Sequence, residues 1–159
     1  MAQFALVTKW HIAAPQTAVW DAIYASERWP EWWPYVVSVE ELEPGDGEGA
    51  GALRRLTWRT RLPYTLSFQV RSSRVEKPHT LEGRASGELE GTGLWRLSSA
   101  GAVTVVRYDW TVDVTKPWMA LLAPLLAPVF KWNHDAVMRA GGEGLAKRLG
   151  TKLLRFETG

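Results

Sequence analysis

The sequence predicts an α+β domain in which an antiparallel sheet packs against one long C-terminal helix. Two observations lead to this prediction. Apolar and polar residues alternate through most of residues 36–115, and apolar residues recur with helical periodicity over residues 119–149. Strict alternation with short connections is typical of an antiparallel sheet that has one dry face. The sheet and the helix must then bury their apolar surfaces against each other.

The N-terminal segment predicts one strand followed by two short helices. Residues 4–12 alternate between two faces, as a strand does. Pro15 opens a helix, since the first helical position does not need the N–H that proline lacks. Residues 26–34 contain two prolines and have room only for a short second helix or a turn.

Further strands are expected at residues 36–43, 52–60, 64–76, 80–87, 90–99 and 102–115. The C-terminal helix is expected over residues 118–147. Pro117, Pro124 and Pro128 predict a bend or break in its first half. No internal repeat or linker divides the chain, so residues 1–159 are expected to form a single domain.

Three segments carry a family resemblance: P..AVWDAIYASERWPEWWPYV near the N-terminus, GELEGTGLWRL followed by VRYDWTVDVTKPWM, and FKWNHDAVMRAGGEGLAKRL. They resemble the helix-grip superfamily labelled START-like or SRPBCC, and within it the polyketide cyclase/dehydrase-type branch, over nearly the whole chain. The resemblance implies a curved seven-stranded antiparallel sheet around the long C-terminal helix, two short N-terminal helices and a hydrophobic cavity. Members bind lipids, steroids, polyketides or quinones, and some cyclise or dehydrate them, so the fold does not choose between carrier and enzyme.

Composition excludes several classes of protein. The chain has no cysteine, which excludes disulfides, thiolate catalysis and iron–sulfur clusters. A net charge of +2 is too small to indicate nucleic-acid binding. The apolar run 119–130 is shorter than the roughly 20 residues of a membrane span, so no stable membrane insertion is expected. With no secretory signal visible, we expect a cytoplasmic soluble protein.

Groups for chemistry are scarce in this sequence. It contains three histidines, no G-x-S-x-G motif, no paired-histidine metal motif and no phosphate-binding glycine loop. We therefore predict no catalytic residue, no metal site and no cofactor. His134 is weighed as a general base for a cyclisation, but a helix-edge histidine bonded to a neighbouring loop is the favoured interpretation.

The expected partner is a small hydrophobic ligand, bound between the sheet and the N-terminal half of the long helix. Ten tryptophans in a short chain favour an aromatic-lined cavity as well as a packed core. The predicted lining residues are Trp33, Trp58, Tyr64, Leu66, Phe68, Tyr108, Trp110, Met119, Leu122, Leu126, Phe130 and Asn133. Asn133 lies on the apolar stripe and is expected to bond either a ligand or, the preferred alternative, the sheet or backbone.

Two further patterns bear on the position and use of this cavity. Gly141 and Gly144 are expected to let the C-terminal half of the helix approach the sheet, leaving the space at the other half. The arginines of the predicted strands are interpreted as a solvated outer surface, with a membrane-docking face as the alternative. The functions considered are ligand binding, a polyketide aromatase/cyclase or dehydratase, and a module regulated by a protein partner.

Overall fold

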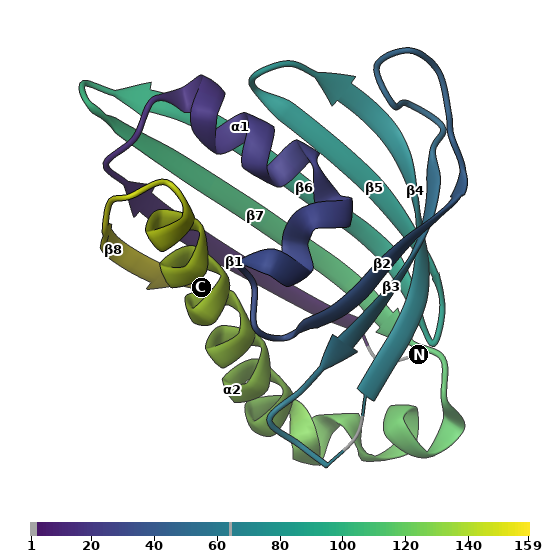
Figure 1. Ribbon diagram of the computed structural model, residues 1–159. Coiled ribbons are helices and arrows are strands. Elements are labelled where there is room, and N and C mark those ends of the chain that lie inside the picture. Colours follow the sequence, from purple (N-terminus) through teal and green to yellow (C-terminus); the bar gives the residue numbers. More distant parts are fainter. Residues whose placement is uncertain (1–2, 64) are drawn as a thin grey trace.

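One eight-stranded antiparallel sheet and three helices make up the part of the chain described by the computed structural model, residues 3–63 and 65–159 (Figure 1). Figure 1 shows the helices on one side of the curved sheet. The sheet order is β2-β3-β4-β5-β6-β7-β1-β8. The elements in chain order are β1 (Gln3–Ile12), α1 (Gln16–Tyr24), the 3₁₀ helix η1 (Ser26–Glu31), β2 (Val36–Glu43), β3 (Leu53–Arg59), β4 (Thr65–Glu76), β5 (Thr80–Gly87), β6 (Leu89–Ala100), β7 (Val103–Val114), α2 (Pro117–Arg148) and β8 (Leu153–Thr158).

Alternation along the strands determines which side chains face the helices. In β7, Val106 and Val112 are buried, while Arg107 between them is partly exposed. Antiparallel registers place Trp58 opposite Leu66, and Trp110 opposite both Leu6 and Gly93. The concave face therefore collects the large apolar residues of every strand, because neighbouring strands keep their inward positions in register.

The expectation of seven strands is wrong, because an eighth strand follows the long helix. Gly150 has a φ of +71°, a left-handed conformation that glycine adopts without strain and that ends the helix. The chain then turns back, and β8 pairs with β1, placing Trp10 opposite Phe156. A six-residue strand with weak alternation gives little signal on its own. It forms here because β1 would otherwise have a free edge.

The long helix α2 runs over Pro117–Arg148 and contains Pro124 and Pro128. The predicted helix, 118–147, agrees within one residue at each end. Figure 1 shows α2 bent, so that its first half turns away from the direction of its second half. Each proline removes a backbone hydrogen bond and pushes against the preceding turn, which bends a helix.

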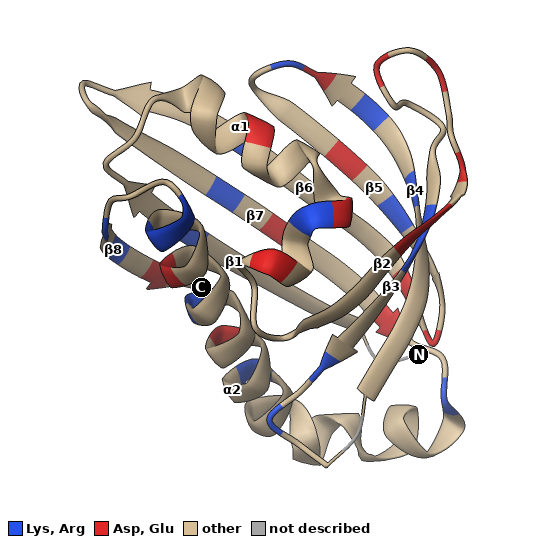
Figure 2. Cartoon of the chain, viewed as in Figure 1, with Lys and Arg blue, Asp and Glu red and all other residues tan. Residues whose placement is uncertain are grey.

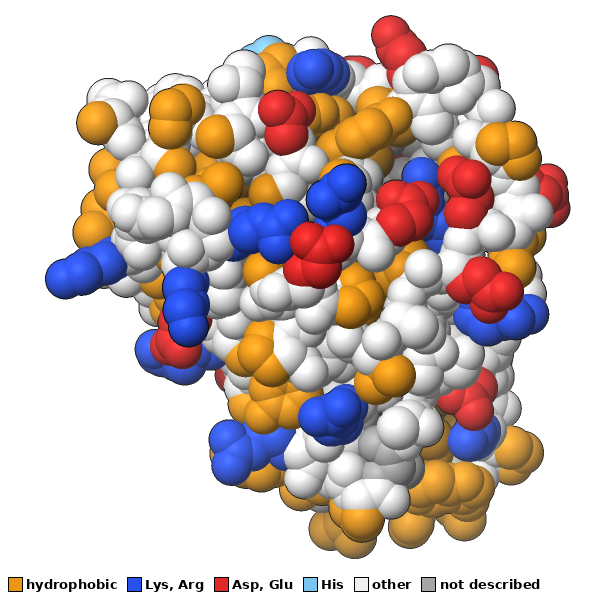
Figure 3. Space-filling model, in the orientation of Figure 1, with side chains coloured by type: hydrophobic (Ala, Val, Ile, Leu, Met, Phe, Trp, Pro, Cys, Tyr) orange, Lys and Arg blue, Asp and Glu red, His pale blue; other side chains and the backbone are white. Residues whose placement is uncertain are grey.

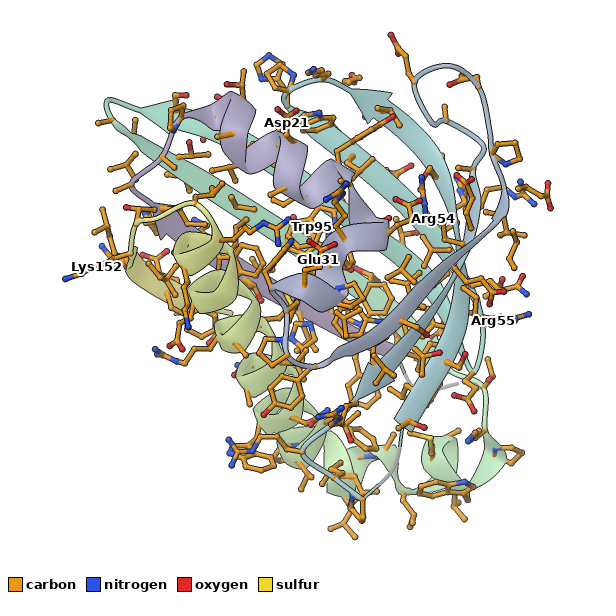
Figure 4. All side chains as sticks on the ribbon, in the orientation of Figure 1. Asp21, Glu31, Arg54, Arg55, Trp95 and Lys152 are labelled. Atoms are coloured by element: carbon orange, nitrogen blue, oxygen red, sulfur yellow. The ribbon has the colours of Figure 1, made fainter. Side chains whose placement is uncertain are left out.

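A cluster of tryptophans joins the helices to the sheet. Trp10, Trp29, Trp33 and Trp95 are nearly inaccessible to solvent. Their ring centroids lie 5.2–6.3 Å apart in the contacting pairs, a separation at which aromatic rings attract each other. In Figure 4, Trp95 lies between the N-terminal helices and the sheet. Much of the tryptophan content is therefore core packing.

The helical glycines make close contacts, but not all of them with the sheet. A Cβ atom at Gly142 would lie 2.8 Å from Trp10 of β1. One at Gly141 would lie 2.4 Å from the ring of Trp33, and one at Gly144 would lie 1.8 Å from the carbonyl oxygen of Trp32. The expectation that Gly141 and Gly144 approach the sheet is therefore corrected. They approach the segment after η1, which itself lies over the sheet.

Candidate functional site

A cavity of about 210 Å³ lies between the concave face of the sheet and the helices. Most of its exposed wall is apolar, as in sites for small organic ligands. Figure 1 shows the elements that enclose it: strands β3–β7 and β1 on one side, η1 and α2 on the other. Its lining includes Phe4, Leu6, Ser26, Trp29, Trp33, Arg54, Leu56, Trp58, Leu66, Phe68, Val70, Trp95, Tyr108, Trp110, Met119, Phe130, Asn133, His134, Val137 and Met138.

The sheet wall contains aromatic rings at inward positions of β4 and β7. Phe68 of β4 lies 5.8 Å from Trp110 of β7 between ring centroids, and Tyr108 lies 6.0 Å from Trp110 in a stacked arrangement. Gly93 of β6 pairs with Trp110, and a Cβ atom at Gly93 would come within 2.5 Å of the Tyr108 hydroxyl oxygen. Glycine at this position therefore leaves room for the Tyr108 side chain beside the cavity.

The helix wall is formed by both halves of α2. Met119 and Phe130 from the bent first half line the cavity, and Phe130 packs edge-to-face on Phe4 with centroids 5.4 Å apart. Val137 and Met138 continue the wall along the second half. Closure at this end depends on a helix segment that contains two prolines.

The segment after η1 closes the other side of the cavity. Trp33 donates a hydrogen bond of 2.8 Å from Nε1 to the carbonyl oxygen of Val137, which ties this segment to α2. Trp58 of β3 packs edge-to-face on Trp33 at 5.0 Å between centroids. The backbone of α2 at Gly141 packs directly against the Trp33 ring, which leaves no room there for a Cβ atom.

Asn133 is buried and bonded within the protein. Its side-chain oxygen accepts a 2.8 Å hydrogen bond from the backbone N–H of Arg61, in the loop after β3. This bond anchors the loop to the middle of α2. The sequence analysis preferred a bond from Asn133 to the sheet or backbone over a bond to a ligand, and the side-chain oxygen does bond backbone. Asn133 also lines the cavity.

Three polar side chains on the cavity wall have an unpartnered atom among the residues that the structure describes. They are the Ser26 hydroxyl oxygen, the Trp58 indole nitrogen and His134 Nδ1. An indole N–H can only donate, so Trp58 requires an acceptor. Leaving such a buried group unsatisfied costs about 1–3 kcal/mol, which a ligand oxygen would recover. Each of these atoms belongs to a residue of the cavity wall, so the three side chains are the candidates for polar contacts with a ligand.

Among the residues that the structure describes, Tyr108 and His134 of the wall do not form an acid–base pair with a hydrogen-bonded carboxylate. Burial raises the pKa of the Tyr108 hydroxyl, so this group stays protonated and can donate a hydrogen bond but not accept a proton as phenolate. His134 Nδ1 lies 4.0 Å from Asp135 Oδ1, too far for a hydrogen bond. Burial opposes ionisation of Asp135, but interactions with His134 and Lys131 outweigh it and lower the Asp135 pKa. Lys131 is the close partner, at 2.6 Å.

An arginine reaches the cavity from the sheet, which the sequence interpretation missed. Figure 4 shows Arg54 on the concave side and Arg55 pointing away from the molecule. Arg54 lines the cavity and forms ion pairs with Glu27 and Glu41. The interpretation of the strand arginines as an outer surface is therefore corrected for Arg54, which lies on the same face of β3 as Leu56. Arg59, at the end of β3, is exposed and also contributes to the cavity lining.

The predicted lining residues divide into three groups. The cavity wall contains Trp33, Trp58, Leu66, Phe68, Tyr108, Trp110, Met119, Phe130 and Asn133. Tyr64 lies outside the described residues. Leu122 and Leu126 do not line the cavity, and Leu122 is 41% exposed. The sequence stripe assumed a straight helix, whereas the bent first half buries Ala123 in place of Leu122.

Other wall residues were missed by sequence reasoning although a signal existed. Leu6 shares its strand face with Trp10, and Trp95 shares its face with Leu97. Both faces are readable from alternation, but alternation does not say which inward positions meet a void. Ser26 has no sequence signal of this kind.

Within residues 3–63 and 65–159, no group of three or more His, Asp or Glu side chains could hold a metal ion.

Comparisons with known proteins agree with this architecture. Residues 3–150 match the family model described as polyketide cyclase / dehydrase and lipid transport. The chain belongs to this family. No curated protein matches the chain in sequence. The resemblance to the START-like/SRPBCC superfamily and its polyketide cyclase/dehydrase-type branch, expected from three sequence segments, is thus confirmed.

Solved structures share the fold at low sequence identity. A START superfamily protein from Mycobacterium smegmatis superposes with a TM-score of 0.75 at 14% identity, covering 92% of this chain and 98% of that one. The Zhui aromatase/cyclase from Streptomyces sp. R1128 superposes with a TM-score of 0.70 at 17% sequence identity, covering 93% of this chain and 96% of that one. The di-domain aromatase/cyclase BexL superposes with a TM-score of 0.74 at 17% sequence identity, covering 91% of this chain and 49% of that one. These likenesses establish the fold and leave the ligand open.

Proposed function

We propose that the protein binds a small apolar ligand that carries hydrogen-bonding oxygen atoms, in the cavity between the sheet and α2. The observation that carries this proposal is an aromatic wall that contains unpartnered polar atoms at Ser26, Trp58 and His134. Apolar walls supply affinity, and a few placed polar groups supply orientation. The family description, which includes lipid transport, supports the same conclusion.

The size of the cavity favours a compact ligand. Its volume of about 210 Å³ lies below the roughly 300–1,000 Å³ of pockets that hold drug-sized molecules. A ring system or a short chain therefore fits this space better than a lipid with two long acyl chains. Polyketide fragments and quinones satisfy both the size and the need for acceptor oxygens.

A cavity-filling variant tests the proposal. Leu66→Trp adds bulk at a wall position, and Leu154→Trp makes the same change at an exposed position on β8, away from the cavity. We expect Leu66→Trp to weaken binding of the probe anilinonaphthalene sulfonate at least tenfold, while Leu154→Trp leaves it unchanged. The stability cost of Leu66→Trp should stay within about 1–3 kcal/mol, because the added ring enters a void.

Native mass spectrometry of the purified protein, with organic extraction, identifies any retained molecule.

Two outcomes of the probe titration would contradict the proposal. Equal probe binding by Leu66→Trp and the wild type would show that the probe lies elsewhere. Unfolding of Leu66→Trp would show that this region is close-packed core. Either result contradicts ligand binding at this position.

An aromatase/cyclase or dehydratase is the second candidate, favoured by the free Nδ1 of His134 on the cavity wall. General acid–base catalysis contributes at least about 10²-fold to a rate. The test is whether the protein turns over a poly-β-ketone mimic and whether His134→Ala slows that turnover. A loss of more than 10²-fold would identify His134 as the base. We expect a smaller effect, since no carboxylate within the described part of the chain hydrogen-bonds this histidine to hold it in place.

A further inference from the structure

The first half of α2 carries an exposed apolar surface. From Pro117 to Phe130 the chain contains no charged residue. Leu121 is 80% exposed and Leu125 is 76% exposed. We call the following residues the α2 apolar patch: Trp118, Leu121, Leu122, Leu125, Val129 and Trp132, all of them exposed. Figure 3 shows hydrophobic side chains gathered at the lower edge of the molecule, where Figure 1 places this half of the helix. An exposed apolar patch of this kind marks an interaction surface.

Positive charge borders the patch. Arg59 ends β3 and Arg61 follows it, and both are exposed. The Arg61 guanidinium lies 5.0 Å from the ring centroid of Trp132, over its face. Among the described residues neither arginine forms an ion pair with a carboxylate. Figure 2 shows the first half of α2 without charged residues and basic segments at the end of β3 and in the loop after it.

The basic residues at the two ends of the apolar run differ from these arginines. Lys116 precedes the run and lies 3.2 Å from Glu88, and Lys131 follows it and lies 2.6 Å from Asp135. Both lysines are therefore neutralised within the protein. The uncompensated charge beside the patch belongs to the arginines.

We propose that the α2 apolar patch docks on the surface of an anionic lipid bilayer. Exposed leucines would enter the boundary between headgroups and acyl chains, as the apolar face of an interfacial helix does. Trp118 and Trp132, at the two ends of the patch, would lie at headgroup level, the position that tryptophan favours. Arg59 and Arg61 would contact lipid phosphates.

Charge favours a bilayer over a second copy of the chain as the occupant. A two-fold dimer through this patch would place the same surface of both copies face to face. Arg59 and Arg61 of each copy would then face the same basic border without a carboxylate to pair with. An anionic bilayer supplies the opposite charge. No described helix is long and apolar enough to cross a membrane, so the contact proposed here is peripheral.

This docking would connect the cavity to the bilayer. Met119 and Phe130, on the inner side of the same helical half, line the cavity. A ligand leaving the cavity past this half of α2 would pass directly into lipid without crossing water. The docking itself does not depend on which molecule occupies the cavity, so it goes beyond the proposed function.

Vesicle co-sedimentation tests the proposal. We expect the wild type to sediment with vesicles of phosphatidylcholine and phosphatidylglycerol, and much less with phosphatidylcholine alone. Leu121→Glu combined with Leu125→Glu should weaken sedimentation at least tenfold. Val37→Glu combined with Leu154→Glu is the matched control, because it changes two exposed apolar residues outside the patch and should bind like the wild type.

A second variant separates charge from apolar contact. Arg59→Ala combined with Arg61→Ala should weaken binding to anionic vesicles by roughly 30-fold, the effect of two juxtamembrane cations. Circular dichroism confirms that each variant is folded, which is expected because every substituted side chain is exposed.

Three results would overturn the docking proposal. The first is a wild type that remains in the supernatant with both vesicle types, and the second is a patch variant that sediments as well as the control. The third is a wild-type dimer in light scattering that Leu121→Glu with Leu125→Glu dissociates, which would show that a second copy covers the patch. Failure of ligand binding in the cavity would leave all of these vesicle measurements unchanged, so the two proposals fail separately.

Discussion

Replacing Gly144 with alanine should destabilise the protein, although helix propensity alone predicts the opposite. In an exposed helix interior this change would stabilise by about 1 kcal/mol. In the folded protein the new Cβ atom would lie 1.8 Å from the carbonyl oxygen of Trp32, far inside van der Waals contact. The contacted atom belongs to the main chain, so no side chain can rotate away. The helix or the segment after η1 must move by well over an ångström.

The expected magnitude follows from these two opposing effects. Overpacking typically costs about 1–3 kcal/mol, and a clash with backbone belongs at the upper end of that range. After the propensity gain, we expect a net loss of about 2 kcal/mol in the free energy of unfolding. For a domain of this size, that loss lowers the Tm by roughly 4–8 °C. Urea denaturation followed by circular dichroism measures it.

A neighbouring position supplies the control. Glu143 is exposed, and its one ion pair with the described residues is to Arg139, at 3.7 Å. Comparing Glu143→Ala with Glu143→Gly measures the propensity difference in this helix, since both variants lose the same ion pair. If Gly144→Ala stabilises the protein by that same difference, the close approach of α2 to Trp32 does not exist.

Three further changes probe contacts in the cavity walls and beside them. Asn133→Ala should lower the free energy of unfolding by about 1–3 kcal/mol, because the backbone N–H of Arg61 loses its acceptor; an unchanged urea midpoint would contradict the role of this bond. Trp33→Phe keeps a six-membered aromatic ring but removes the indole N–H that bonds the Val137 carbonyl, and by the same assay should cost about 1 kcal/mol beyond the effect of the smaller ring. The pKa of Asp135 is lowered from 3.8 in the folded protein, so its stabilising effect is present above that pH and lost as the pH falls through the folded pKa. Urea titrations should show Asp135→Asn less stable than the wild type at pH 7 and indistinguishable from it in strong acid.

Alternation and helical periodicity were sufficient to predict most of the secondary structure. Residues 36–43 and 80–87 were predicted with the bounds that the structure shows, and α2 was predicted within one residue. These patterns are local, because each depends only on which side of a strand or helix is apolar. The same property placed Phe68, Tyr108 and Trp110 on the face that lines the cavity.

What only the tertiary structure decided depends on contacts between distant segments. β8 forms because β1 has a free edge, which is invisible in the six residues of β8 themselves. Leu122 faces solvent because the prolines bend α2 and change which residues the first half buries, whereas periodicity assumes a straight axis. Whether an inward residue meets a void or a packed neighbour depends on the summed volumes of several elements. The sequence therefore predicted which residues face inward, and only the packing of helix on sheet determined where space remains between them.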